Sequence, residues 1–260
     1  MPLTNKISEK PLKIDKLKHN EYYGTQEVYD GYYQRAKKRE KFTDLMKDIL
    51  SRDNLLLAFR NIKHNKGSMS PSLDKKTMKD VAKLSEEEYL IKLSKMARNY
   101  RPHLVRRKEI PKTNGKKRPL GIPTIWDRIF QQAILQVLEP ICEAHFYDKS
   151  FGFRPNKSAE NAIAECAVQV NIAQRTYVVD VDIRGFFDEV NHKKLKQQLW
   201  TMGIQDKWLL YIIGRILKAP VRLEFRALRK ILKAFLLVIA IVYVNADTIM
   251  LIIFKWLRCL

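Results

Sequence analysis

Two carboxylates alternate with apolar residues along a short segment in the second half of the chain. Within residues 177–188, Asp180 and Asp182 are two positions apart, and valine or isoleucine occupies the intervening and flanking positions. Because successive side chains of a β-strand point to opposite faces, both carboxylates would share one face of the strand. Carboxylate oxygens suit Mg²⁺, which keeps some of its waters and accepts phosphate oxygens as further ligands. A solvent-facing aspartate pair at a strand end is the alternative interpretation.

A basic segment, residues 106–123, holds a second group of candidates. Asn114-Gly115 separates two extended runs, and this dipeptide is typical of tight hairpin turns. A rigid basic ribbon can hold a triphosphate or follow a phosphate backbone. A solvated run of charge is the simpler alternative, although the prolines and glycines fix the backbone shape. The cationic residues of the segment are Arg106, Arg107, Lys108, Lys112, Lys116, Lys117 and Arg118.

A third candidate combines aromatic and cationic side chains ahead of a predicted helix. Phe151, Phe153 and Arg154 fall within four positions of one another. Aromatic rings beside an arginine suit stacking on bases or sugars. They equally suit a turn in the core that holds one paired arginine.

Helices and a few strands would position these groups, as in an α+β fold. Apolar spacing near 3.6 residues predicts a helix over residues 42–63 and another following Asp127. Ser85 and Glu88 fit a capping box, which predicts a helix from there to Met96. Further helices are expected over residues 156–173, 191–202 and 206–218, and a strand over residues 176–183.

Composition and charge restrict the class of partner. The 260 residues contain 49 Lys or Arg and 28 Asp or Glu, a formal net charge of +21. This charge favours a polyanion, with nucleic acid ahead of an anionic membrane surface. The apolar content of 46% is too high for a disordered basic tail. The three cysteines form no CxxC pair, so we expect no zinc knuckle. No apolar leader opens the sequence, so we expect a reducing, cytoplasmic setting.

Several ordered blocks together resemble group II intron reverse transcriptases, the intron-encoded maturases. The resemblance covers about residues 40–220 and ends at Pro220. It is carried by Ile110-Pro111-Lys112, residues 117–124, Asp127-Arg128, Gln131-Gln132-Ala133, Leu138-Glu139-Pro140, Ser150 to Pro155, residues 179–183, Phe186-Phe187-Asp188 and Val190-Asn191-His192.

The resemblance implies a right-hand polymerase fold with fingers and an incomplete palm. It implies RNA-templated DNA synthesis, in which a primer hydroxyl attacks a dNTP with the help of Mg²⁺. The expected partners are intron RNA, a DNA primer or target, and dNTP. The expected divisions are a basic N-terminal arm or loosely packed helix (1–41), a fingers region (42–175), the start of the palm (176–220) and an apolar tail (221–260).

Site residues follow from the same resemblance. Asp182 matches the first catalytic aspartate and metal ligand, and Ile183 would supply a backbone carbonyl to the same metal. Phe187 matches the residue beside the sugar 2′ carbon. Nucleotide contacts are implied for Lys112, Lys117 and Arg118, and nucleic-acid contacts for Arg106, Arg107, Lys108 and Arg154.

The family pattern is incomplete in this sequence. The Pro-Gln-Gly-Gly block and the Tyr-Ala-Asp-Asp hairpin that follow in the family are absent, and residues 243–248 offer one aspartate in their place. Two-metal chemistry needs about three convergent carboxylates, so we expect this chain alone to lack polymerase activity. An RNA-binding, maturase-like module is the second hypothesis, and a membrane-tethered basic protein is the third.

The last 40 residues lack both glycine and proline, and 29 of them are apolar. Their apolar run is long enough to span a bilayer, but Asn245, Asp247 and Thr248 interrupt it. A packed helix or strand pair is a further alternative. We favour a shifted reading frame after about Pro220, which translation of the nucleotide sequence in its other frames would test. The sequence does not indicate an oligomeric state.

Overall fold

The structure is a computed structural model that describes residues 19–111, 115, 117–175, 177, 179 and 190–220, with Lys66 and Arg118 described by their backbone alone. Helices predominate in this part, and its two named strands form an antiparallel hairpin. The elements are α1 (His19–Tyr22), α2 (Gln26–Lys37), α3 (Leu45–Ile49), α4 (Arg52–His64), a 3₁₀ turn (Lys66–Met69), α5 (Met78–Val81), α6 (Glu86–Arg98), β1 (Arg106–Pro111), β2 (Lys117–Ile122), α7 (Ile125–Glu143), α8 (Ala159–Asn171), α9 (His192–Thr201) and α10 (Lys207–Leu217).

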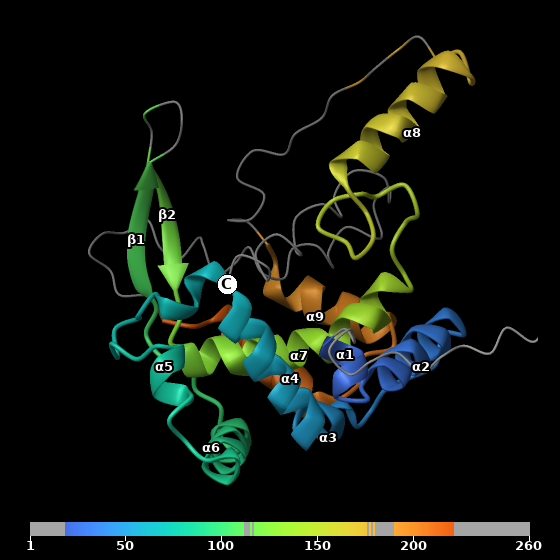
Figure 1. Cartoon of the computed structure of the whole chain (residues 1–260). Coiled ribbons are helices and arrows are strands. Elements are labelled where there is room, and N and C mark those ends of the chain that lie inside the picture. The colour runs from blue at the N-terminus through green and yellow to red at the C-terminus, as the bar shows by residue number, and fades with distance from the viewer. Residues whose placement is uncertain are drawn as a thin grey trace, which may run out of the picture.

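Helix α7 is the centre of the core, and helices α2, α3 and α4 pack against it (Figure 1). Its predicted apolar face is confirmed for Phe130, Ile134, Val137 and Ile141, which are buried, whereas Leu138 is half-buried. The helix continues through Pro140 to Glu143. Its N-cap is Thr124 rather than Asp127, because the Thr124 side chain accepts the backbone N–H of Asp127.

The helix predicted over residues 42–63 is two helices, α3 and α4. Ser51 separates them, and its hydroxyl caps α4 by accepting the backbone N–H of Asn54. A serine side chain competes with the helix ladder for backbone donors and therefore favours such a start. The apolar spacing runs across the break because both helices turn their apolar sides to α7.

In the region expected to be a basic arm or a loosely packed helix, the structure describes helices α1 and α2. Helix α2 buries Tyr29, Tyr32 and Ala36, and packs on α7. The Tyr29 hydroxyl donates to the Asn54 side chain at 2.6 Å, and Asn54 donates in turn to the carbonyl of Ala133 at 3.1 Å. This buried network joins α2, α4 and α7, since buried polar groups need such partners.

Helices α9 and α10 were predicted correctly, and a side chain just before each one caps it. Asn191 caps α9, and Asp206 caps α10 by accepting the backbone N–H of Leu209 at 2.9 Å. The pair is joined to the N-terminal helices by a bridge in which Phe42 N–H donates to the Gly203 carbonyl at 2.8 Å. Gly203 has φ +93°, and a Cβ there would lie 2.4 Å from the Glu40 carbonyl oxygen, so this position requires glycine.

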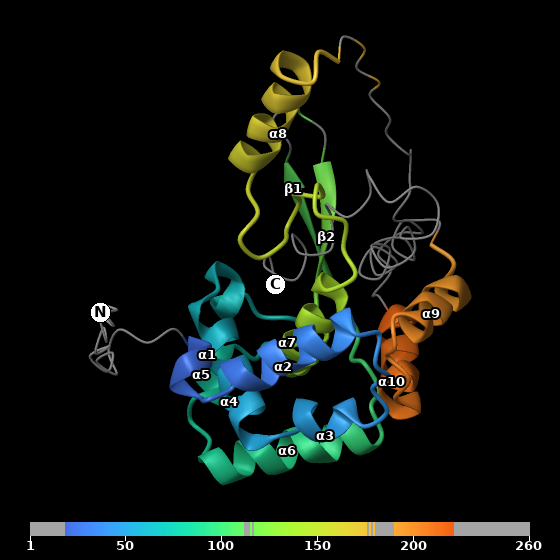
Figure 2. The same cartoon turned by 90° about the vertical axis from the view of Figure 1, so that its right-hand side faces the viewer.

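The β1–β2 hairpin and α8 project to the same side of the helical base, from opposite ends of α7 (Figures 1 and 2). No residue of α8 is buried. The expected hairpin is confirmed, with pairs running from Arg106 opposite Ile122 to Pro111 opposite Lys117. The strand expected over residues 176–183 lies outside the described residues, apart from isolated positions, as does the tail 221–260.

Candidate nucleic-acid interface

The hairpin presents its cations on both faces. Side chains alternate along β1, so Arg106 and Lys108 lie on one face and Arg107 and Glu109 on the other. Lys108 and Lys117 are exposed, and Arg106 and Arg107 are half-buried. Lys117 lies 3.6 Å from the Glu109 carboxylate, and at this exposure such a pair contributes little stability. Within the described residues, no carboxylate forms an ion pair with Arg106 or Lys108, so this face is positively charged there.

The two arginines at the base of the hairpin retain unused donors. The Nε atoms of Arg106 and Arg107 are buried and have no hydrogen-bond partner in the described part of the chain. A guanidinium offers five N–H donors in a planar fork that matches a phosphate. The Nε atoms themselves are enclosed by the protein, so an external phosphate would have to approach the rest of each half-buried side chain.

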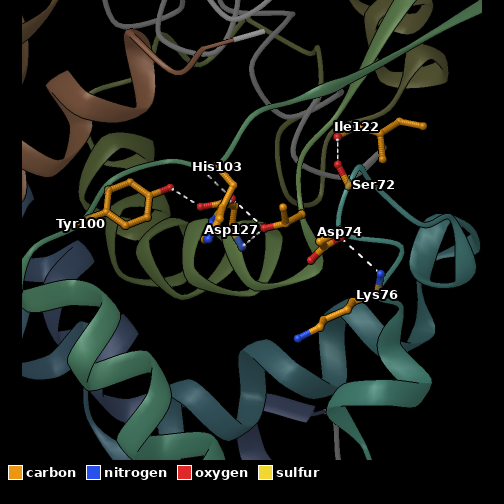
Figure 3. Close-up of polar contacts among 8 residues, drawn as sticks. Ser72, Asp74, Lys76, Tyr100, His103, Ile122 and Asp127 are labelled. Carbon is orange, nitrogen blue, oxygen red and sulfur yellow. Dashed lines mark hydrogen bonds and ion pairs between the residues drawn. The ribbon is translucent and has the colours of Figure 1, made fainter. Parts of the chain in front are cut away.

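Backbone and side-chain hydrogen bonds fix the base of the hairpin to the core. At the start of β1, Val105 N–H donates to the Pro220 carbonyl at 3.0 Å. At the end of β2, the Ser72 hydroxyl donates to the Ile122 carbonyl at 2.6 Å, as Figure 3 shows. The cations consequently extend from a fixed base.

Asp127 is the centre of a buried cluster just below that base. Its side chain is 1% exposed. The Tyr100 hydroxyl donates to one carboxylate oxygen at 2.9 Å, and the Thr124 hydroxyl donates to the other at 2.6 Å. His103 contacts that second oxygen through its backbone N–H at 3.2 Å and through Nδ1 at 2.9 Å (Figure 3). One carboxylate thus joins the segment between α6 and β1 to the start of α7.

The cluster alters the proton affinity of its members. The hydrogen bond to Asp127 raises the pKa of His103, while burial raises the pKa of Tyr100 well above its usual value. Because folding raises the pKa of His103, protonation of this ring stabilises the fold. That stabilisation is fully present below the pKa of the unfolded chain and is lost as the pH rises through the raised value.

Arg128, the next residue along α7, fixes a neighbouring loop. Its guanidinium donates to the carbonyls of Gly67 at 2.7 Å and Ser70 at 2.8 Å. Burial lowers its pKa, yet the group stays charged at neutral pH. The sequence singled out Asp127 as the start of a helix and, together with Arg128, as a family block; the Thr-x-x-Asp spacing of Thr124 and Asp127 was the available signal for the true cap.

Arg154, for which a nucleic-acid contact was expected, is buried and paired inside the loop that follows α7. Its side chain is 4% exposed, and its Nε and Nη2 both lie 2.7 Å from the Glu143 carboxylate. Its Nη1 donates to the carbonyls of Tyr147 and Ser150. These contacts occupy the guanidinium and close the loop after α7, which is the core-turn alternative.

The remaining predicted site residues are not brought together by the described structure. Lys112, Asp182, Ile183 and Phe187 lie outside the described residues, and only the backbone of Arg118 is described. Among the described residues there is no group of three His, Cys, Asp or Glu able to hold a metal ion. The same residues include no helix both long and apolar enough to cross a membrane.

Comparison with known proteins places these observations in a family. Residues 110–234 match the family model described as reverse transcriptase (RNA-dependent DNA polymerase). The matched range contains β2, α7, α8, α9 and α10, and it continues past Pro220, where we expected the likeness to end.

Curated relatives match a longer part of the chain. It is 35% identical over 180 residues to protein YkfC of Escherichia coli, covering 67% of this chain and 47% of that protein. It is 36% identical over 183 residues to the group II intron-encoded protein LtrA of Lactococcus lactis, covering 69% of this chain and 29% of LtrA. Nuclear intron maturase 2 of Arabidopsis thaliana is 32% identical over 95 residues, 36% of this chain and 12% of that protein. The chain thus spans about half or less of the length of these relatives.

Proposed function

Because the chain belongs to the group II intron reverse transcriptase and maturase family, we propose that it binds intron RNA through the β1–β2 hairpin. Nucleic acid is the partner class favoured by the net charge of +21. In this proposal the described residues belong to the fingers and to the part of the palm that follows its first strand. A DNA primer or target and dNTP are the further partners of the complete polymerase reaction.

The observation that carries this proposal is a cationic hairpin held on a rigid base. Arg106 and Arg107 lie half-buried at its base, Lys108 is exposed next to them, and Lys117 is exposed at the opposite end, where it pairs with Pro111. Hydrogen bonds from Val105 and Ser72 fix both strands at the base. Phosphate contacts dominate RNA affinity, and preorganised cations lose less conformational entropy on binding.

The polymerase chemistry depends on residues outside the described part of the chain. Asp182 would hold Mg²⁺ together with the carbonyl of Ile183, and Phe187 would lie beside the sugar. Lys112, Lys117 and Arg118 would contact the triphosphate. When bound, Mg²⁺ supplies charge stabilisation for the attacking and leaving oxygens of nucleotidyl transfer. The donor types fit this ion, since carboxylate and carbonyl oxygens are its preferred ligands.

RNA binding without polymerisation is the second candidate, and one sequence observation favours it. The family's Tyr-Ala-Asp-Asp hairpin is replaced by residues 243–248, which contain a single aspartate. With Asp182 as the one matched catalytic carboxylate, the 260-residue chain has too few ligands to clamp two ions.

The hairpin is tested by replacing Arg106, Arg107 and Lys108 together with glutamine. We expect RNA affinity to fall by about 10- to 100-fold near 0.1 M salt, with a log–log salt slope shallower by about 2–3, because three phosphate contacts are removed. Fluorescence anisotropy with a structured group II intron RNA measures both quantities. The control replaces Lys63, Lys79 and Lys95, which are exposed on other elements, with glutamine. Equal affinity for the two triple variants would refute hairpin binding.

Primer extension separates the two candidates. With Mg²⁺, dNTPs and an annealed RNA template, we expect the 260-residue chain to give no more product than its Asp182→Ala variant. Both proteins should bind the template equally, since the hairpin is unchanged. Extension by the unmodified chain that Asp182→Ala abolishes would instead establish polymerase activity.

A further inference from the structure

Helices α9 and α10 enclose a surface groove of about 770 Å³ that lies apart from the hairpin. Lys193, Lys196 and Trp200 line it from α9, and Lys207, Leu210 and Tyr211 line it from α10. In Figure 2 these helices lie side by side at one edge of the core, below the projecting hairpin.

Helical spacing explains why these side chains share the groove. Lys193, Lys196 and Trp200 are three and four residues apart on α9, and Lys207 and Tyr211 are four apart on α10, so each set follows one helix face. The other faces are committed to the core, where Leu195 and Ile212, for example, are fully buried. Of the residues that line the groove, Leu210 also packs against the core, whereas Trp200 and Tyr211 are exposed.

The charge of the groove favours an anionic occupant. Residues 191–220 contain six Lys or Arg and one acid, Asp206. Asp206 is buried, and its two oxygens accept the backbone N–H groups of Met46 and Leu209, each at 2.9 Å. The lysines that line the groove consequently face no carboxylate from this segment.

Two aromatic rings in the groove add a second chemical signal. Trp200 is 40% exposed and Tyr211 is 53% exposed, which leaves ring surface open to solvent. The Arg215 guanidinium lies 6.0 Å from the centre of the Tyr211 ring and extends the positive charge along α10. Aromatic platforms beside cations are typical of surfaces that stack unpaired bases while holding the phosphates between them.

We infer that the α9–α10 groove binds an unpaired segment of RNA, with bases stacked on Trp200 and Tyr211 and phosphates held by Lys193, Lys196 and Lys207. This inference rests on the RNA binding proposed above and adds a second contact surface to it. An acidic peptide would satisfy the lysines but would leave the two rings without a stacking partner. Residues 221–260 carry seven cations and two acids, so like charge disfavours them as the occupant.

The test uses the full chain and a single-stranded 12-nucleotide RNA. We expect Lys193→Gln, Lys196→Gln and Lys207→Gln together to weaken binding by about 10-fold or more, with a salt slope shallower by about 2. We expect Trp200→Leu and Tyr211→Leu each to weaken it by about 5- to 100-fold, and to affect a blunt RNA duplex far less. Photocrosslinking of 5-iodouridine RNA should place adducts at Trp200 or Tyr211.

The groove variants are compared with three proteins: a control variant, the hairpin variant and the unmodified chain. The control is the Lys63, Lys79 and Lys95 triple variant, and circular dichroism verifies that each groove variant is folded. If the groove variants bind the 12-mer like the control while the hairpin variant loses intron RNA, the groove inference is wrong and the proposed function stands. If the unmodified chain binds neither RNA, the proposed function fails and the groove inference falls with it. If the Trp200 and Tyr211 variants lost affinity equally for the duplex and for the single strand, the groove inference would also be wrong, because stacking needs unpaired bases.

Discussion

Asp127→Ala is expected to lower the free energy of unfolding by about 3–5 kcal/mol, because the carboxylate accepts hydrogen bonds from two buried hydroxyls and from two partly buried nitrogens. The affected groups are the hydroxyls of Tyr100 and Thr124 and both nitrogens of His103 that contact the carboxylate. Urea denaturation followed by circular dichroism measures the loss. In a variant that still folds, NMR titration should also show the pKa of His103 falling toward its ordinary value of about 6.5.

Asp74→Ala is the matched control for this prediction. Asp74 lies near the same cluster but is exposed, and its carboxylate accepts the Lys76 backbone N–H at 3.2 Å (Figure 3). We expect a change below about 1 kcal/mol, which is typical of exposed polar contacts. Similar losses for Asp74→Ala and Asp127→Ala would contradict the view that Asp127 holds the hairpin base to α7.

Arg154→Met is expected to destabilise the fold by about 3–5 kcal/mol while leaving RNA affinity unchanged. The substitution removes one partner of a buried ion pair and leaves the Glu143 carboxylate, 16% exposed, without its cation. Urea denaturation measures the first effect, and anisotropy below the unfolding transition measures the second. Lower stability with unchanged RNA affinity indicates that Arg154 closes the loop and does not contact nucleic acid.

The double variant Arg154→Met, Glu143→Gln provides the internal check. Removing the orphaned charge should recover part of the lost stability, because an unpaired buried carboxylate is more costly than a neutral amide. The Arg154→Met protein could instead fold and lose as much RNA affinity as the hairpin variant. That result would support the direct contact with nucleic acid that the resemblance implied.

Local signals were enough to predict several elements. The Ser85–Glu88 capping box marks the start of α6, and the turn at Asn114-Gly115 marks the hairpin. Asn191 and Asp206 precede α9 and α10 at the predicted positions. For the three helices, the side chain that fixes the boundary is close in sequence to the backbone group that it serves, so the pattern contains the information.

Features that depend on distant partners could not be predicted in this way. Apolar spacing over residues 42–63 does not distinguish one helix from two when both pack on α7. Arg154 could not be assigned to the core without its partner Glu143, eleven positions earlier on another element. The Asp127 cluster likewise joins Tyr100, His103 and Thr124 through a geometry that only the folded chain provides. The roles of Asp182, Ile183, Lys112 and Phe187 stay predictions.

The hydrogen bond from Met46 to Asp206 has a consequence for how the protein is made. The start of α3 obtains this acceptor from a residue 160 positions later in the chain, and the bridge between Phe42 and Ile204 spans a similar separation. During translation, the nascent N-terminal helices therefore wait for the ribosome to deliver residue 206 before these contacts can form. Helices α2, α3 and α4 can already pack on α7 once residues 125–143 have been made, so the contacts of Met46 and Phe42 with the α9–α10 segment are the late ones.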